Sequence, residues 1–225
     1  MKALNVFASI VFVLCVPVLL ITTNVRLAVN DIRLYEYGFN KYNVSTVTKL
    51  DDAELIEVAH QIIDYFNSDE ELLEVDIFSQ REVAHMTDVK GLVRLAYSVQ
   101  LASLVYIAAY IAISFAIKRR AFWQELAKRL LWGSWATIAI LIALGFWALT
   151  GFESLFLLFH LVSFTNDLWQ LSAGDYMLLM FPQGFFNNAA LLIAGASIGE
   201  AAIIGGATWG LLVLRRRAKR KEMSG

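Results

Sequence analysis

The stretch LAYSVQLASLVYIAAYIAISFAIKRRAFWQELAKRLLWGSWATIAILIALGFWALT, residues 95–150, decides the fold. Its two apolar runs, 95–117 and 130–150, are long enough as helices to cross a hydrocarbon core of about 30 Å. The segment between them, 118–129, carries five basic residues. Because short cytoplasmic loops are enriched in Lys and Arg, this pattern predicts a transmembrane hairpin whose loop faces the cytoplasm.

Two further apolar runs, residues 4–21 and about 188–214, flank this hairpin. On the predicted cytoplasmic side, twelve basic residues stand against two acidic ones, whereas the outer segments hold seven basic and seventeen acidic residues. This asymmetry predicts an integral membrane protein, mainly α, with four transmembrane helices and both termini in the cytoplasm. We expect a first transmembrane helix (1–22), an extracellular domain leading into the second helix (23–93), a second helix (94–117), a cytoplasmic loop (118–129), a third helix (130–150), an outer interfacial or re-entrant segment (151–187), a fourth helix (188–214) and a basic cytoplasmic tail (215–225).

Composition agrees with this interpretation, since 58% hydrophobic residues and a positive mean hydropathy are too apolar for a soluble domain of this length. The single cysteine, Cys15, lies inside the first apolar run, so no disulfide framework is expected. That run lacks a small-residue cleavage pattern near Thr22 and Thr23, which favours a retained anchor over a removed signal peptide. The basic tail is an orientation signal and a candidate contact for anionic lipids, and no nucleic-acid partner is expected.

The outer domain is predicted to mix helix with short strands. Residues 24–50 combine β-forming and turn residues, which predicts one or two short strands. From Asp51 or Asp52 a helix is expected, because apolar residues then follow at helical spacing. They are Leu55, Ala59, Ile62, Ile63 and Phe66. His60 lies off this stripe and is expected to be an exposed helix residue.

A second outer helix is expected to begin at Ser79, since Ser79 and Glu82 have the spacing of a capping box. Only Gly91 interrupts the pattern before the second span, so this helix is expected to run into the membrane. It carries His85, and Asp88 lies three residues later on the same face, where a carboxylate could orient the imidazole and raise its basicity. The simpler alternative is an ordinary surface histidine paired with an acid.

His160 stands in the run LFLLFHLVSF, residues 155–164, which is apolar on every side but too short for another span. The run suggests an interfacial or re-entrant helix, on which Glu153, His160 and Asp167 would form one stripe. An ionisable group at a lipid boundary is costly unless it has a partner or a task. Two histidines on one face therefore indicate a site, and the alternative for His160 is a polar side chain that snorkels to water.

The last span contains two patterns of small residues, GASIG (195–199) and GATWG (206–210), that favour close helix contact. Glu200 falls near its midpoint. Such a carboxyl group either is hydrogen-bonded between helices or lines a polar cavity, and we favour the first. Serine-hydrolase elbows, phosphate-binding loops, His-Glu-x-x-His helices and paired-cysteine metal motifs do not occur in this sequence.

Several blocks of the sequence resemble the bacterial lipoprotein intramolecular transacylases. They are REVAHMTDVK (81–90), Phe159-His160 with Phe164, Asn166-Asp167 and Trp169, Met180-Phe181-Pro182 with Phe185-Phe186, and Tyr37-Gly38-Phe39. The resemblance implies a cofactor-free, metal-free acyltransferase in the bacterial cell membrane with its active site at the extracellular face. Its substrate would be a diacylglyceryl-modified lipoprotein amid membrane lipids, whose sn-2 acyl chain moves onto the α-amino group of the N-terminal cysteine to give the lyso form.

The same resemblance implies catalytic roles for His85, His160 and Asp88. It implies substrate contacts for Met86, Asn166, Asp167, Trp169, Phe181 and Tyr37. Our hypothesis is that His85, oriented by Asp88, is the general base and that His160 stabilises the oxyanion or donates a proton, and the reverse assignment stays open.

On the residues alone, two other classes remain open. The histidines could be the axial ligands of a haem b in a membrane cytochrome, or the chain could be a non-enzymatic partner or sensor. A zinc hydrolase using His85, Asp88, His160 and Asp167 lacks support from ligand spacing.

Overall fold

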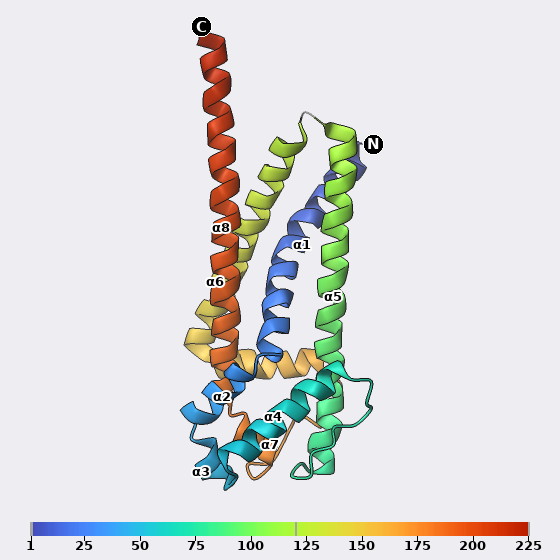
Figure 1. The fold of residues 1–225 in the computed structure, drawn as a ribbon, viewed down its shortest axis with the longest axis vertical. Helices are drawn as coiled ribbons and strands as arrows, with labels where there is room; N and C mark the ends of the chain where they lie inside the picture. The colour runs from blue at the N-terminus through green and yellow to red at the C-terminus, as the bar shows by residue number, and fades with distance from the viewer. Residues whose placement is uncertain (1, 120, 225) are drawn as a thin grey trace. The chain divides into compact units, whose positions relative to one another are not determined.

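The computed structural model describes residues 2–119 and 121–224, and every regular element in these ranges is a helix (Figure 1). The helices are α1 (Lys2–Val29), α2 (Ile32–Lys41), α3 (Val44–Thr48), α4 (Asp52–Asn67), α5 (Gln80–Lys118), α6 (Phe122–Ser163), α7 (Tyr176–Met180) and α8 (Gln183–Ser224). Four of them, α1, α5, α6 and α8, are long and apolar enough to cross a membrane. The prediction of a mainly α-helical, four-span membrane protein is confirmed.

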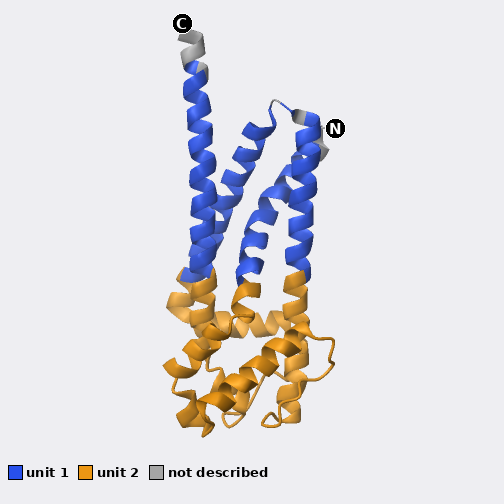
Figure 2. Ribbon diagram, in the orientation of Figure 1, with its two compact units in different colours: residues 1–24, 98–145, 194–225 blue, residues 25–97, 146–193 orange. Residues whose placement is uncertain are grey.

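The chain divides into two compact units (Figure 2). Unit 1 comprises residues 1–24, 98–145 and 194–225, and unit 2 comprises residues 25–97 and 146–193. Unit 1 therefore contains the apolar parts of the four long helices, the basic loop between α5 and α6 and the basic end of α8. Unit 2 holds α2, α3, α4 and α7 together with the remaining parts of the long helices.

Helices of unit 1 contact one another through small residues and through side-chain hydrogen bonds to the main chain of a neighbouring helix. The Tyr106 hydroxyl on α5 donates to the Ala8 carbonyl of α1 at 2.9 Å. On α6, Gly133 faces Val16 of α1 so closely that a Cβ added there would lie 2.6 Å from the valine Cβ. Apolar side chains gain little by leaving lipid for one another, so close contact and hydrogen bonding hold such helices together.

The predicted contact face of α8 is corrected by the structure. Gly195, Gly199, Gly206 and Gly210 face open space. The buried residues of α8 in unit 1 are Ser197, Ala201, Thr208 and Leu212, and Gly205 lies against Ser134 of α6. The small-residue patterns predicted the right helix but the wrong face, because they identify residues that permit contact and not the direction from which a neighbour comes.

Glu200 takes part in a polar cluster between α1 and α8. The Asn24 amide, buried in unit 1, donates to the Ser197 hydroxyl at 3.1 Å and to the Glu200 Oε2 atom at 2.9 Å. The predicted hydrogen bonding of this carboxyl group between helices is confirmed. The cluster compensates for placing polar groups in an apolar part of the chain.

In unit 2, the strands predicted within residues 24–50 are wrong, because this segment forms α2 and α3. On α2, Tyr35, Gly38 and Phe39 are buried, which is the spacing of one helical face. The Asp31 side chain caps this helix by accepting from the Arg33 amide at 3.1 Å. The β-propensity of the tyrosines and phenylalanine gave way to burial on a helical period, as tertiary context commonly dictates.

The predicted helix after Asp51 is confirmed as α4, and a capping box between Asp51 and Glu54 starts it. Its buried stripe includes Leu55, Ala59 and Ile62, whereas His60 is exposed as expected. Around α4 the core of unit 2 gathers large side chains from α4 itself, from α2, α5, α7 and α8 and from segments between helices. They include Tyr35, Phe39, Tyr65, Phe66, Phe78, Met86, Met177, Met180, Phe181 and Phe185.

α6 is bent at Gly151, where the backbone leaves helical dihedral angles. The part of α6 after this bend, residues 152–163, lies crosswise to the N-terminal part of α5 within unit 2 (Figure 1). The bend therefore turns the run that contains His160 toward the start of α5.

Candidate active site

The first turn of α5 is fixed by Glu82, which is 1% exposed. Its Oε2 atom accepts from the Ser79 amide at 2.7 Å, which confirms the predicted capping box. Its Oε1 atom accepts from the Met177 amide of α7, also at 2.7 Å. One buried carboxylate thus caps α5 and ties α7 to it, just ahead of the first candidate catalytic residue.

His85 lies one turn after Glu82 and is 6% exposed. Its ring meets the Phe164 ring edge-on at 5.1 Å, and its Nδ1 atom is buried with no hydrogen-bond partner. Burial, and then the nearby His160, lower the pKa of His85 to about 4, although the charge of Asp88 acts in the opposite direction. The imidazole is therefore neutral at ordinary pH, with an unused buried polar atom.

His160 lies after the Gly151 bend and is 8% exposed. Its Nδ1 atom is 2.7 Å from the Phe156 carbonyl oxygen, one turn earlier. Since a carbonyl only accepts, Nδ1 carries the hydrogen and the lone pair of the neutral ring is on Nε2. Aromatic rings surround the imidazole, with centroids 4.3 Å away for Phe156, 5.6 Å for Phe164 and 5.0 Å for Trp169.

The loop after α6 is tied to α5 beside the histidines. The Asp88 carboxylate accepts from the Asn166 amide at 2.9 Å, and the Arg81 guanidinium donates to the Asp167 main-chain carbonyl. Asp88 thus influences His85 through its charge, while it accepts a hydrogen bond from the loop. These two tethers hold the loop whose Trp169 packs on His160.

The other residues proposed as substrate contacts lie in two different settings. Met86 and Phe181 are buried in the core of unit 2, where Phe181 packs on Phe39 and Phe185. Tyr37 is 51% exposed on α2, and its hydroxyl accepts from the Lys41 ammonium. The structure thus brings His85 and His160 to Phe164, Trp169 to His160 and Asn166 to Asp88. It places Met86, Phe181 and Tyr37 in other surroundings.

Two neighbours of the histidines were not singled out as site residues. Phe156 and Phe164 precede and follow His160 by four residues, so one helical face carries all three. That spacing is visible in the sequence. No comparable sequence pattern predicts the hydrogen bond between Glu82 and α7, because this bond joins residues 95 positions apart. Among residues 2–119 and 121–224, no three His, Cys, Asp or Glu side chains cluster closely enough to share a metal ion.

Four membrane-spanning helices and two imidazoles packed on one phenylalanine define a polytopic membrane protein with a candidate acid–base site. The family described as lipoprotein intramolecular transacylase Lit matches this sequence over residues 10–186, and the chain belongs to that family.

Solved structures of the membrane integral lipoprotein intramolecular transacylase Lit from Bacillus cereus share the fold. One has a TM-score of 0.83 at 23% identity and covers 97% of this chain and 100% of its own. A variant of that protein with a histidine-to-alanine substitution has a TM-score of 0.77 at 22% identity, covering 96% and 97% of the two chains. At this identity the likeness establishes the fold.

An uncharacterized protein from Aquifex aeolicus (strain VF5) is 30% identical over 118 residues, which make up 52% of this chain and 50% of that protein. The match therefore spans about half the length of this curated relative.

Proposed function

We propose that this protein is an intramolecular acyltransferase that moves the sn-2 acyl chain of a diacylglyceryl-cysteine lipoprotein onto the cysteine α-amino group. Family membership supports the reaction class. The observation that carries the proposal is the histidine pair, in which both buried imidazoles pack on Phe164 and each has a different hydrogen-bonding state.

The reaction requires a base and an oxyanion donor. The α-amino group first loses a proton, because an ammonium has no lone pair for attack. Its nitrogen then attacks the sn-2 ester carbonyl, and the tetrahedral oxyanion collapses with cleavage of the ester C–O bond. The glyceryl oxygen that leaves takes up a proton and becomes a hydroxyl group. Because donor and acceptor belong to one molecule, positioning alone supplies part of the rate enhancement.

We assign the general base to His160. The bond from its Nδ1–H to the Phe156 carbonyl holds the ring and leaves Nε2 free to accept the ammonium proton. The same bond stabilises the imidazolium that forms. The first proton passes on to water, and Nε2 then takes the second proton, which the nitrogen loses after attack. This second proton passes to the leaving glyceryl oxygen as the ester C–O bond breaks, so one imidazole serves these proton transfers.

We assign oxyanion stabilisation to His85. A general base works best with a pKa near the working pH, and a pKa of about 4 makes His85 a weak one. A neutral imidazole held in a buried site can instead donate a hydrogen bond to developing negative charge. Its unpartnered Nδ1 atom supports a role that begins only when substrate is bound. Of the two assignments that the sequence left open, this one reverses the first.

The remaining residues would position the substrate. Asp88 and Asn166 hold the loop that brings Trp169 to His160, and we propose that this loop forms the entry for the lipoprotein N-terminus. Met86, Asp167, Phe181 and Tyr37 stay proposed substrate contacts, with Tyr37 on the exposed face of α2 suited to the protein part of the substrate. The charge asymmetry of the sequence supports an extracellular site.

Tandem mass spectrometry of a lipoprotein N-terminal peptide tests this function, in a host without other N-acylating enzymes. Total mass does not change on intramolecular transfer, so only the masses of the fragment ions show where the acyl chain is attached. We expect an N-acylated cysteine with a mono-acylated glyceryl thioether when the protein is present, and a free amine with an intact diacylglyceryl group when it is absent. A free amine in both cases would refute the proposal, and His60→Gln is the matched control for histidine variants because His60 is exposed.

A further inference from the structure

Unit 1 has a groove between α1 and α6 at the basic end of the bundle, far along α6 from its His160 segment. The groove encloses about 900 Å³, a volume typical of small-molecule sites. Its walls are mostly apolar residues of α1 and the indole rings of Trp132 and Trp135. At its mouth stand Glu125, Lys128 and Arg129.

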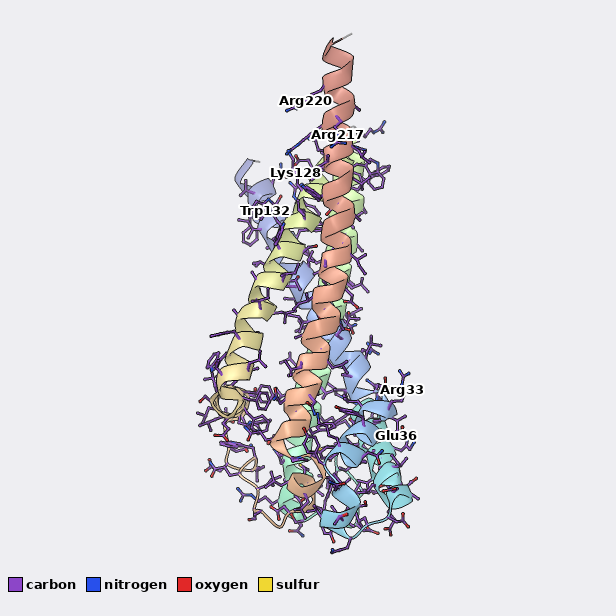
Figure 3. The ribbon with its side chains drawn as sticks, turned by 90° about the vertical axis from the view of Figure 1, so that its left-hand side faces the viewer. Arg33, Glu36, Lys128, Trp132, Arg217 and Arg220 are labelled. Atoms are coloured by element: carbon purple, nitrogen blue, oxygen red, sulfur yellow. The ribbon has the colours of Figure 1, made fainter. Side chains whose placement is uncertain are left out.

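A second groove, of about 570 Å³, lies on the other side of α6, toward α8. It is lined by Leu131 and Leu212, and Arg216 stands at its edge. Lys128, Trp132 and Trp135 line both grooves. These three residues follow one another along α6, so they form a ridge with an apolar groove on either side and an ammonium group at one end. Figure 3 labels two of them, Lys128 and Trp132, toward the same end of α6.

Charges at this end of the ridge leave an excess of positive charge. Glu125 pairs with Lys128 at 3.5 Å and with Arg129 at 3.1 Å, so its single negative charge offsets only one of them. Arg216 adds a further positive charge on the α8 side. The side chain of Lys128 is 48% exposed, and the Nε atom of Arg129 is buried without a hydrogen-bond partner. The half-exposed ammonium group of Lys128 therefore remains accessible to an anion.

We propose that this ridge binds one anionic diacyl phospholipid. Its phosphate lies at Lys128, between Arg129 and Arg216, and its two acyl chains lie in the two grooves on either side of Trp132 and Trp135. Cationic side chains attract anionic headgroups, and tryptophan prefers the boundary between headgroups and hydrocarbon. A soluble phosphate would leave both apolar grooves unfilled, and a zwitterionic lipid would leave the excess charge uncompensated. The site is separate from the histidine pair and does not rest on the proposed reaction.

The test is native mass spectrometry of the purified full-length protein after equilibration with equimolar phosphatidylglycerol and phosphatidylcholine. We expect the protein to retain one phosphatidylglycerol at least fivefold more than phosphatidylcholine. The double variant Lys128→Gln/Arg216→Gln should lose this preference. Its matched control, Arg217→Gln/Arg220→Gln, removes the same charge from exposed residues that line neither groove, and it should keep the preference.

The variant Trp132→Ala tests the ridge without changing charge, and it should lower retention of phosphatidylglycerol at least threefold. Equal loss in the Arg217→Gln/Arg220→Gln control would overturn the proposal, because the attraction would then belong to the whole basic end. Equal retention of the two lipids, or displacement of phosphatidylglycerol by soluble glycerol phosphate, would also overturn it. Ten of the twelve predicted cytoplasmic basic residues remain in each double variant, so the orientation signal is preserved.

Discussion

The two units differ in where they place their large apolar side chains. Unit 2 buries large side chains such as Leu55, Tyr65 and Met180, each with at most 1% exposed. Unit 1 turns many of its largest side chains outward, and Trp132 and Ile203 are 67% and 74% exposed. Water drives apolar groups together in the first case, whereas lipid provides no such drive in the second. The tightly packed core of unit 2 is a suitable frame for a site that must hold two imidazoles in fixed geometry.

Buried polar groups are less sharply divided between the units. In unit 1, Thr137 bonds to the Gly133 carbonyl of its own helix at 2.9 Å and Tyr106 bonds to the main chain of a neighbouring helix, but the Nε atom of Arg129 is buried without a partner. In unit 2, burial leaves the Nδ1 atom of His85 without a partner. An unpaired buried polar group costs stability, so its presence at the histidine pair indicates selection for something other than stability.

Removing either imidazole should have the largest effect. We expect His160→Gln and His85→Gln each to lower the transfer rate by about 10²–10⁴-fold, the range typical of a lost acid–base or oxyanion group. The rate of N-acylated cysteine formation, measured with purified protein in vesicles, gives the result. His60→Gln should leave it unchanged, and full activity in either site variant would remove the two-histidine mechanism.

Truncation of a buried leucine should distinguish the two cores. Leu55→Ala in unit 2 should cost about 2–5 kcal/mol of unfolding free energy, because transfer and cavity terms add. Leu141→Ala in unit 1, where the leucine is 6% exposed, should cost less than about half as much, since the transfer term is missing in lipid. Unfolding of both variants by sodium dodecyl sulfate in mixed micelles provides the comparison, and equal losses would contradict it.

Acid should destabilise the protein through His85. Its usual pKa is 6.5 and its folded pKa is about 4, so the unfolded chain binds a proton in this window that the folded protein does not. The unfolding free energy therefore decreases as pH falls from 6.5 to about 4, by at most about 3 kcal/mol, and is unaffected above 6.5. Thermal midpoints between pH 7.5 and 4.5 should fall less steeply for His85→Gln than for the parent protein. If the thermal midpoints of the two proteins fall equally steeply with pH, carboxyl groups alone cause the loss of stability in acid.

Spans and helix starts could be predicted because each depends on a local or one-dimensional signal. A bilayer requires a long apolar run, and the capping box at Ser79 and Glu82 lies within four residues. The strands assigned to residues 24–50 failed because the buried spacing of Tyr35, Gly38 and Phe39 was outweighed by residue propensity.

The histidines of the site could be predicted, but their partners could not. A histidine in an apolar run is visible in sequence because it breaks the pattern. The partner of Asp88 is Asn166, from a loop 78 residues away, and such pairings depend on the tertiary fold. The same holds for α8, where the hydrogen bonds of Asn24 select a face that the glycine pattern did not.

The smallest expected effect concerns this polar cluster of unit 1. Replacing Asn24 with leucine keeps the volume and removes the bonds to Ser197 and Glu200. Interhelical hydrogen bonds in membranes contribute about 0.6–2 kcal/mol, so Asn24→Leu should lower the unfolding free energy by about 1 kcal/mol. Thr23→Val, which removes the neighbouring bond from Gln100 at 3.0 Å, is the matched control and should cost a similar amount. A loss above about 3 kcal/mol in Asn24→Leu alone would mean that the Glu200 carboxyl group is costly without the Asn24 amide. In that case Glu200→Gln should restore the stability of the Asn24 variant.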